Sequence, residues 1–235
     1  MNGYINSFQS MGAVDGPGLR YVVFMQGCPL RCTYCHNPET WRPREGEICT
    51  PEFVCERIIR YKPYFGEEGG VTVSGGEPLI QPEFVAALFC LLKAKGIHTA
   101  LDTSGAGDLE KAAEVLKYTD LVLCDLKFST EEAYREHCGG SLSHTLAFMR
   151  LAETMKVPMW VRHVVAPGLT DSPENIREIR RLAKDFSNLV KIEWLPFKNI
   201  CKVKYDRLKL NFTMGDSPSY SQIRVNQLVS ESEDA

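Results

Sequence analysis

The chain has 235 residues, of which 44% are apolar, 24% charged and 10% aromatic, and this ordinary globular composition excludes a disordered or fibrous chain. Its formal charge of −3 disfavours binding to nucleic acid or to an anionic membrane through bulk electrostatics. No apolar run approaches the ~18 residues of a membrane span, and residues 1–10 lack the features of a signal peptide, so we expect a cytoplasmic protein.

Short apolar runs rich in β-branched residues alternate with helical patterns along the chain. The runs are bounded by Gly, Pro or Asp, which predicts buried strands over residues 19–26, 70–73, 97–102, 120–126, 159–165 and 190–195. Helices are predicted between and after them, over residues 51–62, 82–95, 108–117, 141–155, 172–186 and 218–228. Thr50 is the expected N-cap of the first helix and Asp171 or Ser172 that of the fifth, while Gly96 is expected to end the second.

This alternation gives about six β-α units, which predicts an α/β fold with a parallel sheet and right-handed crossovers. The runs are apolar throughout, as expected for strands covered on both faces. Six units are too few for the complete eight-fold barrel, so we expect a partial (β/α)6 TIM-like barrel. The sequence shows no repeat and no Ser/Gly-rich linker, which predicts a single domain over residues 1–235 with an acidic tail that frays from about residue 230.

Polar and special residues follow each predicted strand. In parallel α/β architectures, functional sites gather at the carboxyl ends of the strands. The residues at these ends are Gly27-Cys28, Ser74-Gly75-Gly76-Glu77, Asp102-Thr103-Ser104-Gly105, Asp125 and Lys127, Arg162 and His163, and Pro196-Phe197-Lys198. Six strand ends that supply polar groups to one rim indicate a binding or catalytic site there.

Nine cysteines are present, and three of them form the motif Cys28-x3-Cys32-x2-Cys35 on the first of these loops. Three cysteines on a cubane leave one iron without a protein ligand, and an open coordination position is typical of a catalytic centre. The spacing therefore favours an open [4Fe–4S] cluster. A structural zinc site is the alternative, but its fourth ligand would be His36, which is too near Cys35 in sequence, or a distant cysteine. Cys55, Cys90 and Cys124 fall in apolar patterns and are expected to be buried, whereas the other three lie near turns.

The cysteine loop, residues 27–37, carries a family resemblance. With Tyr34 before the last cysteine, it resembles the cluster loop of radical S-adenosylmethionine (SAM) enzymes, and Thr72–Pro78 resembles the GGE segment of that family. The likeness is narrower still to the activases of glycyl radical enzymes, above all those that act on pyruvate formate-lyase. It runs from about residue 3 to 197 through the segments at 14–20, 26–28, 35–37, 101–105, 125–127 and 164–168. Only 38 residues separate Cys35 from Ser74, and the two cysteines between them, Cys49 and Cys55, are too few for extra clusters. The chain therefore resembles the short activases, which lack a ferredoxin-like insertion between these loops.

The resemblance implies an oxidoreductase with two cofactors, a [4Fe–4S] cluster and S-adenosylmethionine. The reduced cluster cleaves S-adenosylmethionine to methionine and a 5′-deoxyadenosyl radical, which takes hydrogen from a backbone glycine of a partner enzyme. The implied protein substrate is a glycyl radical enzyme, pyruvate formate-lyase, and the implied reductant is of flavodoxin or ferredoxin type. An activase of another glycyl radical enzyme and a radical SAM enzyme with a small-molecule substrate are alternatives. A non-enzymatic zinc-binding adaptor has no need of the polar rim.

The resemblance also implies a role for each matching residue. The catalytic cluster would be held by Cys28, Cys32 and Cys35. Contacts to S-adenosylmethionine would come from Tyr34, Cys35, His36, Gly75, Gly76, Glu77, Asp125, Leu126, Lys127, Arg162 and Lys198. A Na⁺ or K⁺ ion beside the cofactor would be held by Asp102, Thr103, the carbonyl of Leu123 and Asp125. Asp15 would lie at the mouth, against the glycine loop of the substrate protein. The activases carry histidine where this chain has Lys198, and lysine offers donors but no acceptor.

Overall fold

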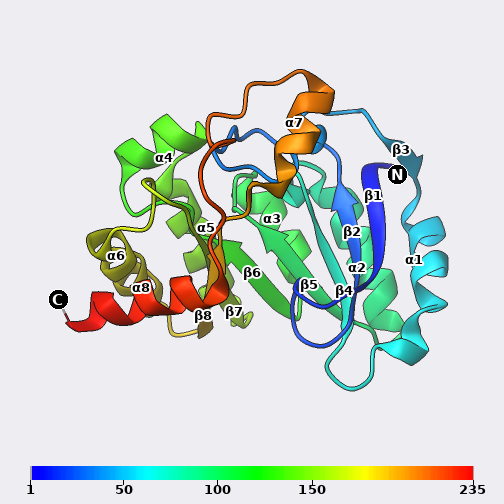
Figure 1. Cartoon of the computed structure of the whole chain (residues 1–235). Coiled ribbons are helices and arrows are strands. Elements are labelled where there is room, and N and C mark those ends of the chain that lie inside the picture. Colours follow the sequence, from blue (N-terminus) through cyan, green and yellow to red (C-terminus); the bar gives the residue numbers. More distant parts are fainter. Residues whose placement is uncertain (1, 235) are drawn as a thin grey trace.

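A computed structural model describes residues 2–234 of the chain, and its centre is one eight-stranded sheet (Figure 1). In spatial order β3-β1-β2-β4-β5-β6-β7-β8, the strands are Glu47–Cys49, Gly3–Gly12, Arg20–Met25, Gly70–Gly75, His98–Thr103, Leu121–Asp125, Met159–Val165 and Leu189–Pro196. The last six of these are parallel neighbours in chain order, as in a partial barrel. The predicted α/β class and all six predicted strands are therefore confirmed.

Helices follow the parallel strands and lie along the sheet (Figure 1). They are α1 Pro51–Ile59, α2 Pro82–Ala94, α3 Leu109–Leu116, α4 Glu131–Cys138, α5 Leu142–Thr154, α6 Pro173–Lys184, α7 Lys202–Leu208 and α8 Gln222–Asp234. The predicted caps are confirmed, because Thr50 accepts a hydrogen bond from the amide of Phe53 and Ser172 one from the amide of Asn175. Gly96, at φ +64°, follows the end of α2.

Elements without an apolar run escaped the sequence-based prediction. The strands β1 and β3 add an antiparallel pair to the edge of the parallel strands, and β1 alternates between buried and exposed residues. Neither α4, which is mostly charged, nor the basic α7 was predicted. The tail was expected to fray from about residue 230, but α8 continues to Asp234, and Ser232 is buried; residue 235 lies outside the described part.

The core lies on the faces of the central strands, where β4, β5 and β6 are almost wholly buried, as predicted for strands covered on both sides. Of the cysteines expected to be buried, Cys55 and Cys124 are, whereas Cys90 is exposed on α2, so that expectation was wrong for Cys90. It lies seven residues after the exposed Glu83, on the solvent side of α2 opposite Val85 and Leu92. Within residues 2–234, no helix has the length and apolarity needed to cross a membrane.

Candidate functional site

The cluster loop, residues 27–37, leaves the carboxyl end of β2 and is held by its backbone. The amide of Gly27 donates to the carbonyl of Thr40 (2.6 Å), and the amide of Arg31 donates to the carbonyl of Cys138 at the end of α4 (2.8 Å). The amide of Thr33 donates to the carbonyl of His137 (2.8 Å). The three cysteines of the loop are partly exposed, so its thiols are presented while its backbone is fixed on both sides.

The loop after β4 is joined by backbone hydrogen bonds to the end of β2 and to the cluster loop that follows it. The amide of Gly76 donates to the carbonyl of Met25 (3.0 Å) and that of Glu77 to the carbonyl of Gly27 (2.9 Å). A Cβ on Gly76 would lie 2.1 Å from the Gly27 oxygen, which only a glycine avoids. Gly75, at φ +110°, also requires glycine. The two glycines thus allow the two loops to approach each other closely.

The carboxylate of Glu77 is buried and fully engaged by the protein. Its Oε1 accepts from the Thr103 hydroxyl (2.5 Å) and the Leu79 amide (3.0 Å), and its Oε2 accepts from the Ser104 amide (2.9 Å) and hydroxyl (2.6 Å). These four donors compensate for the burial of the charge. The structure therefore places this predicted cofactor contact as a link between the loops after β4 and β5.

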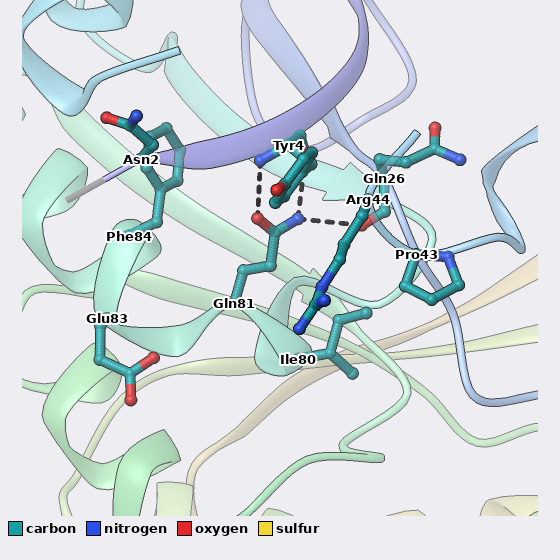
Figure 2. Close-up of a pocket in the computed structure, with 9 residues that line it drawn as sticks. All are labelled: Asn2, Tyr4, Gln26, Pro43, Arg44, Ile80, Gln81, Glu83 and Phe84. Atoms are coloured by element: carbon teal, nitrogen blue, oxygen red, sulfur yellow. Dashed lines mark hydrogen bonds between the residues drawn. The ribbon is translucent and has the colours of Figure 1, made fainter. Parts of the chain in front are cut away.

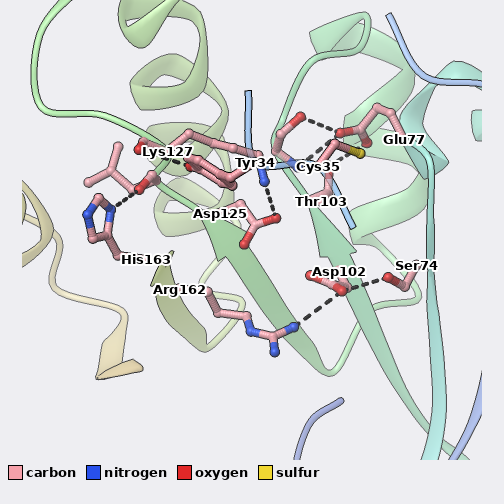
Figure 3. Close-up of polar contacts among 12 residues, drawn as sticks. Tyr34, Cys35, Ser74, Glu77, Asp102, Thr103, Asp125, Lys127, Arg162 and His163 are labelled. Atoms are coloured by element: carbon pink, nitrogen blue, oxygen red, sulfur yellow. Dashed lines mark hydrogen bonds and ion pairs between the residues drawn. The ribbon is translucent and has the colours of Figure 1, made fainter. Parts of the chain in front are cut away.

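A second carboxylate, Asp102, lies at the end of β5 in a buried charged network (Figure 3). Its Oδ2 accepts from the Ser74 hydroxyl (2.6 Å) and from Arg162 Nη1 (3.3 Å). Arg162 Nε also lies 3.1 Å from Oε2 of Glu193, a residue that the sequence did not single out. Among the described residues, Oδ1 of Asp102 has no hydrogen-bond partner. Burial raises the pKa of Asp102 to about 6, against the opposing effect of Arg162.

A third group of predicted residues lies at and just after the carboxyl end of β6. Lys127 Nζ pairs with Asp125 Oδ2 (2.6 Å), and the Tyr34 hydroxyl donates to the Lys127 carbonyl (3.2 Å), so the cluster loop touches this segment (Figure 3). The carbonyl of Leu126 lies 2.6 Å from Nδ1 of His163 on β7. Burial lowers the pKa of His163 to about 4, so the ring is neutral and its Nδ1–H donates. The sequence placed His163 on the rim without a partner, and the structure supplies one.

The thiols of the cluster loop differ in their surroundings. Burial raises the pKa of Cys28 to about 12 and that of Cys35 to about 11. The pKa of Cys32 is lowered, chiefly by the neighbouring Cys138 thiol and also by nearby Lys127. Cys138 is fully buried at the end of α4. The sequence carried no signal for this neighbour, since α4 itself was not predicted.

Lys198 does not join the other predicted contacts. Its Nζ donates to the carbonyl of Tyr220 (2.6 Å), and this directs the side chain into the C-terminal segment. His36 on the cluster loop instead lies near Phe197, with ring centres 6.4 Å apart, and burial lowers the pKa of His36. From the C-terminal segment, the Tyr205 hydroxyl donates to the carbonyl of Cys35 (3.0 Å).

The loop with Asp15 enters the barrel from the amino ends of the parallel strands, because it leads into β2. The carbonyl of Asp15 accepts from the Thr72 hydroxyl (2.6 Å), and the carbonyl of Val14 accepts from Arg162 (3.2 Å). Burial raises the pKa of Asp15. A pocket of about 500 Å³ lies between this loop, β8 and α8, and Glu193 lines it.

A pocket of about 320 Å³ opens beside β1, away from the predicted site residues (Figure 2). Its central side chain is Gln81, whose amide bonds both the N–H and the carbonyl of Tyr4 and also the carbonyl of Gln26. These bonds satisfy the backbone at the edge of the sheet. This pocket contains none of the predicted ligands, and we assign it a structural role.

Comparison with known proteins supports the resemblance. The model of the radical SAM superfamily matches residues 22–183. A pyruvate formate-lyase-activating enzyme from Clostridium pasteurianum is 46% identical over 215 residues, which are 91% of this chain and 90% of that protein. A pyruvate formate-lyase-activating enzyme from Staphylococcus epidermidis is 42% identical over 223 residues, or 91% of this chain and 88% of that protein.

Solved structures agree in fold. A domain of a pyruvate-formate lyase-activating enzyme from Bacteroides vulgatus has a TM-score of 0.55 at 23% identity, covering 70% of this chain and 95% of that one. Streptococcus suis SuiB bound to its precursor peptide SuiA has a TM-score of 0.69 at 16% identity, covering 91% of this chain and 46% of that one. At these identities the likeness is one of fold alone.

Proposed function

The chain belongs to the radical SAM superfamily, and from this we propose that it activates a pyruvate formate-lyase by removing a hydrogen atom from one of its backbone glycines. One observation carries the proposal: the 46% identity to a pyruvate formate-lyase-activating enzyme extends over nine-tenths of both chains. This coverage includes the cluster loop, the loop after β4 and the charged network of Asp102 and Arg162. We place this activity in the cytoplasm, since all nine cysteines are free thiols.

The donors of the cluster loop fit a [4Fe–4S] cluster. Cys28, Cys32 and Cys35 supply three soft thiol ligands, the type that iron–sulfur clusters use. Within residues 2–234, no three His, Cys, Asp or Glu side chains converge on a position for one metal ion. A cubane distributes its ligands over separate irons, so its three thiols need not converge on one position. The neighbouring Cys138 thiol lowers the pKa of Cys32 and so favours its thiolate form, which is the ligating form.

When bound, the reduced cluster and S-adenosylmethionine together supply a carbon-centred radical that can take hydrogen from glycine. The chain's own residues bind and orient these groups. We propose that the backbone around Tyr34 and His36 holds the adenine, with the neutral His36 ring beside Phe197. The amide of Gly76 is already bonded to Met25 at the end of β2 and that of Glu77 to Gly27 of the cluster loop, so the loop after β4 offers carbonyl oxygens to an ammonium group.

The charged residues hold the other end of the cofactor in this proposal. Lys127 is buried against Asp125, and Arg162 against Asp102 and Glu193, so both cations are fixed before a ligand arrives. Fixed charges in a site that excludes water orient a ligand without a cost of reorganisation at the moment of reaction. His163 keeps the Leu126 carbonyl in place between Asp125 and Lys127.

We extend the proposal to a Na⁺ or K⁺ ion at Asp102. The observation in its favour is Oδ1 of Asp102, a buried carboxylate oxygen without a partner among the described residues. Leu123 is the neighbour of Asp102 in the register of β5 and β6. The hydroxyl of Thr103, in contrast, donates to Glu77 and accepts from the Gly105 amide, so Thr103 can offer only one remaining lone pair. The alkali-ion dependence of S-adenosylmethionine binding, compared in Na⁺, K⁺ and tetramethylammonium buffers, tests this extension.

The substrate glycine needs a path to the site, and we propose that it passes the loop of Asp15. The pocket of about 500 Å³ between that loop and β8 is large enough for a few residues of a polypeptide. It reaches Glu193, which pairs with Arg162 of the charged network. Ala13, Val14 and Gly16, which line the pocket on either side of Asp15, would then face the incoming backbone.

Anaerobic reconstitution with iron and sulfide tests the function. We expect about four irons per chain, a brown protein, and an EPR signal of the reduced cluster that changes when S-adenosylmethionine is added. With pyruvate formate-lyase, the glycyl-radical doublet should then appear, and a partner with its target glycine replaced by alanine is the control. A colourless protein with one tightly bound zinc would refute the proposal. Formation of 5′-deoxyadenosine without a doublet would favour a small-molecule substrate.

A further inference from the structure

The C-terminal segment 198–210, which includes α7, lies on the cluster loop (Figure 1). The hydroxyl of Tyr205 donates to the carbonyl of Cys35 (3.0 Å), and Lys204 pairs with Glu39 just beyond the loop (2.5 Å). Tyr205 is buried by these contacts. The inner side of α7 therefore touches the backbone of a proposed cluster ligand, while its outer side is left for another role.

The charge of this segment is opposite to that of the whole chain. Residues 198–210 contain five Lys or Arg and a single Asp, although the formal charge of the chain is −3. Lys202 pairs with Asp206. Neither Arg207 nor Lys209 forms an ion pair within residues 2–234, and both are exposed. Two positive charges thus point away from the molecule beside the cluster loop.

Apolar side chains are exposed among these charges. Ile200 is 72% exposed, Val203 65%, Leu208 42% and Leu210 38%. We name as the α7 surface the set Ile200, Val203, Arg207, Leu208, Lys209 and Leu210. Exposed apolar residues with a charged rim are typical of protein interfaces, and a small area with one sign of charge suits a transient encounter.

We propose that the α7 surface docks an acidic, low-potential one-electron carrier protein. The inference rests on the proposed function, because a [4Fe–4S] cluster held by Cys28, Cys32 and Cys35 must be reduced before each turnover. The carrier loses one electron and the cluster gains it, passing from the 2+ to the 1+ state, with no bond made or broken. Charge complementarity selects an acidic partner, and Tyr205 holds the docking helix against the backbone of Cys35.

The substrate enzyme is the less suitable occupant of the α7 surface. Its glycine must enter the barrel, and the pocket beside Val14 and Glu193 lies along β8 and α8 rather than over the cluster loop. A lipid surface is also less suitable, since α7 has only seven residues and its Tyr205 side is committed to the protein. An electron carrier needs only a brief contact close to the cluster, which a small surface can provide.

The test compares two charge reversals in the reconstituted holoprotein. Arg207→Glu with Lys209→Asp alters the α7 surface, and Arg60→Glu with Lys156→Asp is the matched control. Lys209 and Lys156 are both exposed residues in the left-handed region, at φ 55° and 57°, and Asp tolerates this conformation. Arg60 and Lys156 precede β4 and β7, at the end of the strands opposite to the cluster loop.

Binding and electron transfer are measured separately, with flavodoxin as the acidic probe. At low ionic strength, the α7 variant should bind oxidised flavodoxin about tenfold more weakly and accept electrons from reduced flavodoxin about tenfold more slowly, and salt should reduce the difference. Reduction by photoexcited deazaflavin, a small neutral donor, should be unchanged. The control variant should behave as the native chain in all three measurements, and Val203→Asn should weaken binding without changing its dependence on salt.

Unchanged flavodoxin binding and rate in the α7 variant, or an equal loss in the control, would overturn the proposal. So would a loss of glycyl-radical formation that persists after deazaflavin reduction, since the surface would then serve the substrate enzyme. Salt-sensitive binding to phosphatidylglycerol vesicles that displaces flavodoxin would assign it to lipid. If the native chain forms no glycyl radical after deazaflavin reduction, the proposed function fails instead, and the binding comparison still decides the role of the surface.

Discussion

Two buried arginines, one near each end of the parallel strands, are satisfied in different ways. Arg20, at the amino end, donates to the Thr72 hydroxyl (3.0 Å) and the carbonyl of Val71 and lies 3.3 Å from His98 Nδ1. Within the described residues, no carboxylate pairs with it, and burial lowers its pKa to about 10. Arg162, further along the strands, pairs with Asp102 and Glu193.

The difference separates a structural arginine from one in a working site. The partners of Arg20 are mainly neutral acceptors of the protein itself, so every contact stabilises the fold and none is left for a ligand. The carboxylates around Arg162 raise its pKa in spite of burial. One oxygen of Asp102, Oδ1, has no hydrogen-bond partner among the described residues. Unsatisfied polar atoms among fixed charges are a feature of binding sites rather than of cores.

The most severe test of this comparison is the loss of a cluster ligand at the carboxyl end. Cys32→Ser should abolish the cluster and reduce S-adenosylmethionine cleavage below detection, because one iron loses its thiolate. Cys90→Ser is the matched control, since Cys90 is exposed on α2 and should leave both intact. Iron and sulfide content and 5′-deoxyadenosine formation are the measurements. An equal loss in both variants would contradict the assignment of the cysteines.

Replacing each arginine by methionine tests the comparison directly. Each variant should lose about 3 kcal/mol of unfolding free energy, because buried acceptors or carboxylates are left without a donor. Only Arg162→Met should also slow S-adenosylmethionine cleavage per cluster, by about 10²-fold, since misplaced groups cost that much. Urea unfolding and single-turnover cleavage separate the two effects. Similar cleavage rates in the two variants would contradict the assignment of Arg20 to the fold and of Arg162 to the site.

The pH dependence of stability tests the state of Asp102, the carboxylate that pairs with Arg162 but has no counterpart at Arg20. The folded pKa of Asp102, about 6, lies above its unfolded value of 3.8, so the folded state holds this proton more tightly. The stability that this proton contributes to the folded state is therefore fully present below about pH 4 and is lost as the pH rises to 6. Relative to Asp102→Asn, the native chain should lose on the order of 2 kcal/mol across this range, as measured by urea unfolding. A difference that does not change with pH would show that Asp102 ionises normally.

The smallest effect is expected at Lys198. Its ammonium donates to the Tyr220 carbonyl, away from the cluster loop, so Lys198→Met should cost only about 1 kcal/mol of stability. Cleavage of S-adenosylmethionine should change by less than about twofold, because the side chain makes no contact in the charged network. A large rise in the KM for S-adenosylmethionine would contradict this prediction and show that Lys198 contacts the cofactor, as the family resemblance implied.

Apolar patterning was sufficient to predict the parallel strands, because the central ones are buried on both faces. The last strand, β8, is only partly buried but still carries an apolar run. The strand β1, which lies between β3 and β2, lacks this pattern because many of its residues are exposed. The helices α4 and α7 are too polar to show a periodic apolar face. Residue type predicted that Cys28 and Asp102 belong to the rim. It could not predict direction: Glu77 faces Ser104, and Lys198 faces Tyr220, because both depend on neighbours distant in sequence.

The packing of Arg20 and the loop before it has a consequence for the traffic of molecules. Gly18 lies against the backbone of Gly69, with no room for a Cβ, and Arg20 is fully buried above the start of β4. A substrate loop that passes Asp15 would therefore meet a fixed wall at Gly18 and Arg20 and would have to turn back there.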